Sequence, residues 1–129
     1  MKKLSHQISW FVVVGATAAL VHWLVVVALV GTGLLAPLLA NIIGWLVAFL
    51  FSFTGHYQLT FRHQRGSLLR SVKRFFVLSG AGFLVNEASF ATLLYQTELP
   101  YELLLGMVLV GVAFLTFIAS RFWAFAAIR

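Results

Sequence analysis

The sequence predicts an all-α integral membrane protein whose chain crosses the bilayer four times. Of its 129 residues, 62% are hydrophobic and only 9% are charged, whereas a soluble domain carries about 25% charged residues. Four apolar segments are long enough to cross the hydrocarbon as helices, which takes about 20 residues each. All nine Lys and Arg residues fall on one side of a four-span arrangement. We expect one domain over residues 1–129.

The spans follow from the apolar runs and their breaks. The first is expected at 9–30, because its apolar run is longer than the core of a cleavable signal peptide, about 7–15 residues. Gly31-Thr32-Gly33 and then Pro37 break the chain before a second span at 37–59. The third and fourth spans are expected at 75–96 and 101–125, with a basic loop at 60–74. The runs do not alternate as barrel strands do, so helices are expected.

The basic residues predict the orientation. Lys2 and Lys3 precede the first span, Arg121 and Arg129 end the fourth, and the remaining five lie in or beside the central loop. Cytoplasmic loops are enriched in Lys and Arg. Both termini and the central loop are therefore expected in the cytoplasm.

An internal repeat is suggested at an offset of about 65 residues. Phe11-Val12 and Gly15-Ala16 match Phe76-Val77 and Gly80-Ala81. A two-span repeat keeps its direction, so the halves would be parallel repeats about an axis along the membrane normal. Chance is the alternative, because apolar segments use few residue types.

Small residues recur every four positions along the second span, which keeps them near one helix face. We expect this stripe to be a helix–helix contact, since small residues let backbones approach closely in lipid. A groove for a lipid chain is the alternative. The expected packing residues are Ala40, Gly44 and Ala48, with Gly15 in the first span.

Polar residues inside the spans are candidates for a transport path. Glu87 lies about 12 residues into the third span, near the bilayer middle, where ionisable groups usually face a bundle interior or a cavity. His22 is its partner in the repeat, and a His–Glu pair can share a proton. Asn86 and Asn41 complete the candidate path. The alternative is that these groups are only hydrogen-bonded within the helix bundle.

The cytoplasmic ends of the spans offer groups that bind phosphate. Arginine binds phosphate through two hydrogen bonds, and clusters of basic residues beside a span favour anionic lipid. Plain topology is the alternative for the loop residues, and snorkelling is the alternative for Arg121. The candidates are Arg121, His56, Tyr57, Arg62, Arg65 and Arg74.

Several chemistries find no support. The chain has no Cys and no Asp, and it carries no nucleotide-binding glycine loop, HExxH motif or Ser/His/Asp set. We expect no enzyme activity, no metal and no cofactor. The net charge of +6 is interpreted as topology, so no nucleic-acid partner is expected.

Three segments resemble the GtrA-like family of small four-span membrane proteins. They are Phe11-Val12-Val13-Val14-Gly15, the run from Leu39 to Phe61, and Ser120-Arg121-Phe122-Trp123-Ala124-Phe125. The resemblance implies flipping of a polyprenyl-phosphate-linked sugar, or of the polyprenyl-phosphate carrier, across the bacterial cytoplasmic membrane for cell-surface polysaccharide synthesis.

Other functions remain open at this point. The chain could be a non-transporting accessory or anchoring subunit of a membrane glycosyltransferase. A small multidrug exporter is similar in size and span number, but such proteins typically carry a Glu in the first span, where this chain has His22. Four helices enclose little volume. If the chain forms a transport path, we therefore expect it to assemble as a homo-oligomer.

Overall fold

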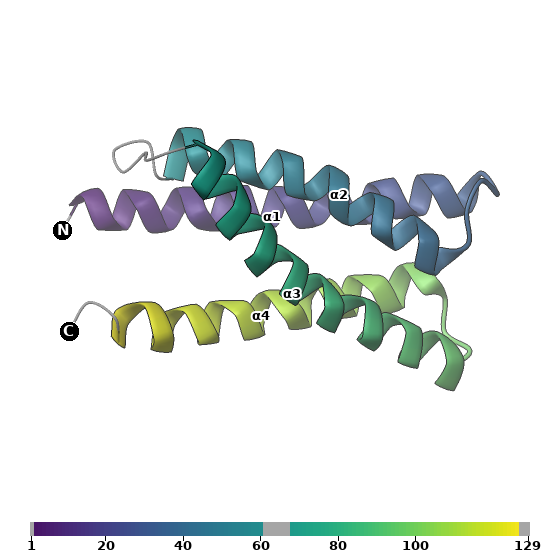
Figure 1. The fold of residues 1–129 in the computed structure, drawn as a ribbon. Coiled ribbons are helices and arrows are strands. Elements are labelled where there is room, and N and C mark those ends of the chain that lie inside the picture. The colour runs from purple at the N-terminus through teal and green to yellow at the C-terminus, as the bar shows by residue number, and fades with distance from the viewer. Residues whose placement is uncertain (1, 61–67, 127–129) are drawn as a thin grey trace. The chain divides into compact units, whose positions relative to one another are not determined.

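A computed structural model describes the backbone of residues 2–60 and 68–126 (Figure 1). Within it, the described side chains are those of residues 5–6, 8–59, 69–70, 73–74 and 76–115. The elements in chain order are α1 (Lys2–Gly31), α2 (Pro37–Gly55), the π-helix η1 (His56–Thr60), α3 (Leu68–Gln96) and α4 (Tyr101–Ala126). The described residues contain no strand. The predicted class, a small four-helix membrane protein, is confirmed.

The helices have the length and apolar composition to cross a bilayer. Three apolar spans, Ile8–Gly31, Pro37–Leu59 and Phe76–Gln96, are long enough by themselves. In α4 the apolar part found among the described residues is Tyr101–Leu115, within a helix of 26 residues. A helix of that length extends about 39 Å, more than the hydrocarbon thickness of about 30 Å.

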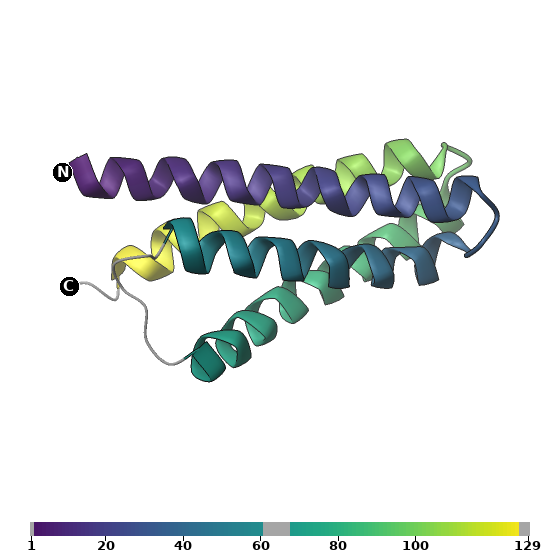
Figure 2. The ribbon, with the colours of Figure 1, turned by 90° about the horizontal axis from the view of Figure 1, so that it is seen from above.

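The chain divides into two compact units, residues 1–80 and 81–129, and the boundary falls inside α3. In the first unit, α1 and α2 lie side by side and run in opposite directions (Figures 1 and 2). The start of α3 belongs to this unit. The units therefore do not coincide with the two halves of the predicted repeat, which meet in the central loop.

The turn between α1 and α2 is set by a glycine and a proline. Gly33 has φ +76°, which costs little only for glycine. Its N–H donates to Val30 O at 3.0 Å, and the Leu34 N–H donates to Leu29 O at 3.0 Å, the two bonds of a Schellman motif. Pro37 then takes the first position of α2, where its missing N–H costs no helical bond.

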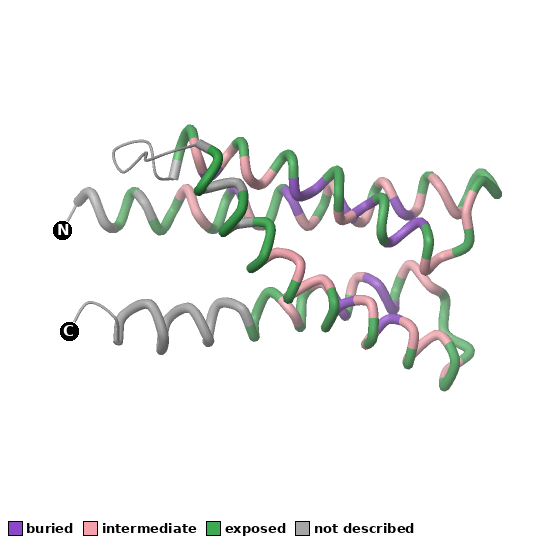
Figure 3. The backbone as a smooth tube through the Cα atoms, viewed as in Figure 1, coloured by how far each residue is buried: buried purple, intermediate pink, exposed green. Residues whose placement is uncertain are grey.

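Two glycines of α2 lie in close contact with α1. A Cβ on Gly44 would lie 2.8 Å from His22 Cδ2 and 3.0 Å from the His22 carbonyl oxygen. A Cβ on Gly55 would lie 2.7 Å from Val14 Cγ1. Ala40 and Ala48 are also buried, and the buried stretches of α1 and α2 face one another (Figure 3). The small residues of α2 thus lie where the two helices meet.

Two features differ from the sequence-based expectation. First, α3 begins at Leu68, seven residues before the expected span, so Arg70, Lys73 and Arg74 lie on a helix and not in a loop. Arg and Lys are good helix formers, so the helix continues beyond its apolar part. Second, a Cβ on Gly15 would meet nothing within 4 Å among the described residues, so no close helix approach is found there.

The second unit contains the remainder of α3 and α4. The turn between them follows Thr97, whose N–H and hydroxyl both bond to Leu93 O, at 3.0 and 2.8 Å. The Leu104 N–H donates to Pro100 O at 3.1 Å and starts α4. Phe90 of α3 and Leu104 and Leu105 of α4 are fully buried.

We predict that Gly44→Ala destabilises the protein by about 1–3 kcal/mol, the usual cost of overpacking. The added Cβ meets a backbone oxygen, which cannot rotate away. Gly15→Ala is the matched control in the neighbouring helix, and we expect it to be neutral or slightly stabilising. Unfolding of both variants in detergent, monitored by circular dichroism, measures the difference in their stability. Equal stability of the two variants would contradict the close approach.

Candidate functional site

The first polar site is a buried hydrogen bond between α1 and α2. The His22 Nε2 lies 2.7 Å from the Asn41 Oδ1. Because the amide oxygen accepts, the Nε2 carries the proton. His22 is 5% exposed and Asn41 is not exposed at all. Two of the four predicted transport-path residues are thus bonded to one another in a closed helix interface.

The depth of this pair follows from the hairpin. Asn41 lies only four residues, about 6 Å, into α2. His22 is nine residues before the end of α1. The pair therefore lies nearer to the turn at 32–36 than to the opposite end of the hairpin. In the apolar span Ile8–Gly31, His22 is the fifteenth of 24 residues, so it lies a little past the middle of the span on the side of this turn.

The second polar site is in α3, within the second unit. Asn86 is 4% exposed, and Glu87 is partly buried. Glu87 is the twelfth of 21 residues in the apolar span Phe76–Gln96, so it lies at mid-span. Successive residues on a helix point about 100° apart, so the two polar groups serve neighbouring faces.

The predicted pairing of His22 with Glu87 stays a prediction. His22 belongs to the first unit and Glu87 to the second. The hydrogen-bond partner that the structure gives to the His22 Nε2 is Asn41. Among the described residues, no three His or Glu side chains come together as metal ligands.

The predicted phosphate-binding residues fall into different environments. The His56 ring is 5% exposed and stacks on Phe11, with ring centroids 4.9 Å apart, so it is part of the helix packing. Tyr57 is partly buried and Arg74 is exposed. Arg62 and Arg65 lie outside the described residues, as does the side chain of Arg121. The structure thus leaves Tyr57 and Arg74 as accessible members of this set.

Sequence reasoning missed a row of aromatic residues that runs along α2 and into η1. Trp45, Phe49, Phe53 and Tyr57 follow one another at intervals of four, and each ring contacts the next. The Trp45 Nε1–H donates to the Ser79 Oγ of α3 at 2.8 Å. The interval of four was visible in the sequence as a signal of one shared helix face. The partner Ser79 was not, because it comes from a distant segment.

The chain continues from this row into a π-helix. η1 spans His56–Thr60, directly after Gly55 ends α2. Short π-helical turns are rare in proteins, but those that occur are often found at functional sites. Here the turn carries both His56 and Tyr57, so it sets the direction of two predicted site residues.

We predict a favourable coupling of about 1 kcal/mol between His22 and Asn41, in the range measured for polar pairs in membrane helices. Each single change, His22→Leu or Asn41→Leu, leaves a buried polar atom without this partner and destabilises the fold. The double variant should lose less than the sum of the two. A double-mutant cycle by unfolding in detergent measures the coupling, and purely additive losses would refute the bond.

The chain was compared with known protein families, curated proteins and solved structures. Residues 10–125 match the family described as GtrA/DPMS, transmembrane domain. No curated protein and no solved structure matches the chain. The matched range includes both polar sites, the aromatic row and most of each helix. The chain belongs to the GtrA/DPMS transmembrane-domain family.

Proposed function

We propose that this protein flips a polyprenyl-phosphate-linked sugar, or the polyprenyl-phosphate carrier, across the bacterial cytoplasmic membrane. Its family associates it with glycosyl-lipid processes at a membrane. The observation that carries the finer proposal is the polar pair Asn86 and Glu87 in the middle of the apolar span Phe76–Gln96. No enzyme activity is part of the proposal.

The position of Glu87 supports passage of a polar head group. An ionisable residue at the bilayer centre costs at least about 2.5 kcal/mol on insertion scales, and such residues usually line polar paths. A sugar or phosphate crossing the membrane needs hydrogen-bond partners at this depth. The carboxyl group of the partly buried Glu87 lies at this depth, and the buried Asn86 amide lies beside it on a neighbouring face.

The charges support an anionic lipid substrate. Arg70, Lys73 and Arg74 lie at the start of α3; Lys73 and Arg74 follow Arg70 by three and four residues, so both are its neighbours on the helix surface. Basic clusters beside a span attract anionic lipid head groups. We propose that these residues collect the phosphate before it enters the path. We further propose a homo-oligomer, since four helices enclose little volume for a sugar.

We predict that Glu87→Gln lowers flipping of a labelled polyprenyl-phosphate sugar about tenfold or more, as loss of roughly 1.5 kcal/mol of charged hydrogen bonding would. Arg70→Ala should lower it less, because its neighbours retain positive charge. Purified protein in liposomes is assayed by loss of label accessibility with time. The matched control is Glu98→Gln, the same change at an exposed acid in the turn after α3, which should keep wild-type activity.

Two outcomes would overturn parts of this proposal. Near-wild-type flipping by both Glu87→Gln and Arg70→Ala would refute the site assignment. Absence of flipping by the wild-type protein, alone and at any protein density, would refute transport.

A second candidate is an accessory or anchoring subunit of a membrane glycosyltransferase. The family is described as a transmembrane domain, which favours this candidate because such a domain can anchor a partner enzyme in the membrane. In this case the protein would co-purify with the glycosyltransferase, and deletion would lower that enzyme's activity. The liposome assay would then show no flipping.

A further inference from the structure

The aromatic row along α2 and the start of η1 forms an unbroken series of ring contacts. We call Trp45, Phe49, Phe53 and Tyr57 the aromatic ladder. Successive ring centroids are 6.3, 6.3 and 5.6 Å apart, within the range of direct aromatic contact. Twelve residues separate its ends, so the ladder extends about 18 Å along the helix axis. It leads from the interior of the span to the π-helix at the end of α2.

One end of the ladder is fixed against α3. Phe76 contacts both Trp45 and Phe49, with ring centroids 5.5 and 5.4 Å apart. The hydrogen bond from Trp45 to Ser79 holds the same region. Phe76 is nevertheless 48% exposed, and Trp45, Phe53 and Tyr57 are partly exposed. Phe49 is only 8% exposed, so the surface that a hydrophobic chain can reach is formed by Trp45, Phe53, Tyr57 and Phe76.

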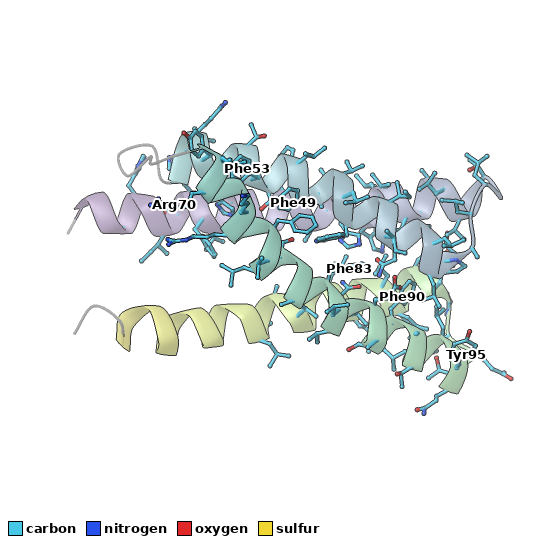
Figure 4. The ribbon with its side chains drawn as sticks, in the orientation of Figure 1. Phe49, Phe53, Arg70, Phe83, Phe90 and Tyr95 are labelled. Carbon is cyan, nitrogen blue, oxygen red and sulfur yellow. The ribbon has the colours of Figure 1, made fainter. Side chains whose placement is uncertain are left out.

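The other end of the ladder lies at the basic end of the unit. Both views place the end of α2 and the start of α3 at the same end of the first unit (Figures 1 and 2). Figure 4 shows Arg70 at the start of α3, and Phe49 and Phe53 on α2. Lys73 and Arg74 are exposed at this end. A positive end joined to a long apolar track matches one kind of molecule, an anionic amphiphile with a long chain.

We propose that the aromatic ladder binds the isoprenoid chain of a polyprenyl phosphate, with the phosphate at the Arg70–Arg74 end. This inference rests on the proposed function and identifies the part of the substrate that the protein recognises. Bilayer lipids with straight acyl chains are in large excess, so a substrate site must distinguish chains. Isoprenoid units differ from saturated acyl chains by their double bonds and methyl branches, and aromatic rings offer large apolar faces for such groups.

Competitive binding tests the inference. Purified protein in detergent is mixed with a polyprenyl phosphate and a straight-chain saturated alkyl phosphate of equal carbon number, and native mass spectrometry measures the bound ratio. The wild-type protein should prefer the polyprenyl phosphate. Phe53→Leu should lower this preference about fivefold, as loss of one aromatic contact would. Phe53→Tyr, which keeps the ring, should retain the preference.

The matched control is Phe51→Leu. Phe51 is 42% exposed on the same helix, two positions from Phe53 and therefore about 200° away around the axis. This variant should bind as the wild-type protein does. Unfolding in detergent shows whether the two leucine variants are equally stable. If Phe53→Leu is less stable than Phe51→Leu, the Phe53→Tyr variant tests whether the ring at position 53 is needed for the chain preference.

The inference would be overturned by the absence of a chain preference in the wild-type protein, or by equal preference in Phe53→Leu and Phe51→Leu. Phe53→Tyr binding with a lowered preference would also overturn it. None of these results bears on flipping, which the liposome assay measures separately. If the wild-type protein flips the lipid but shows no chain preference, the proposed function stands and the aromatic ladder has no part in recognising the chain.

Discussion

The hydrocarbon core of a bilayer offers no hydrogen-bond partner, and the described structure satisfies its polar groups accordingly. The backbone is helical throughout the apolar segments. The hydroxyls of Thr17, Thr54 and Thr92 donate to the carbonyl four residues earlier, at 2.7 to 2.8 Å. His22 bonds to Asn41, and Trp45 bonds to Ser79. Among the described residues, no buried side-chain nitrogen or oxygen lacks a partner.

The same constraint separates two kinds of intramembrane polar group. His22 and Asn41 are enclosed where Gly44 lets α1 and α2 approach closely, and this pair stabilises the helix hairpin. Glu87 is only partly buried and lies at mid-span in another unit. The hairpin therefore accounts for two of the four residues first considered for transport. Asn86 is as enclosed as His22, at 4% exposed, so a transport path would depend chiefly on Glu87.

The sequence predicted the helices well and their contacts poorly. Apolar runs broken by Gly33 and Pro37 located the first hairpin, because both residues have strong backbone preferences. The early start of α3 was missed, since hydropathy marks the apolar part of a helix and not its polar extension. The partners His22–Asn41 and Trp45–Ser79 join segments 19 and 34 residues apart. Such tertiary contacts cannot be obtained from the spacing of residues along one helix.

The phosphate-lipid account depends most on four spans with the basic end in the cytoplasm, and cysteine accessibility tests this directly. The chain has no native Cys, so single cysteines at Ser5, Leu34, Leu69 and Leu99, all exposed, can be treated with a membrane-impermeant maleimide in bacterial cells. The account predicts labelling at positions 34 and 99 in intact cells, and at positions 5 and 69 only after permeabilisation. Labelling at position 69 in intact cells, or protection of position 34, would contradict it.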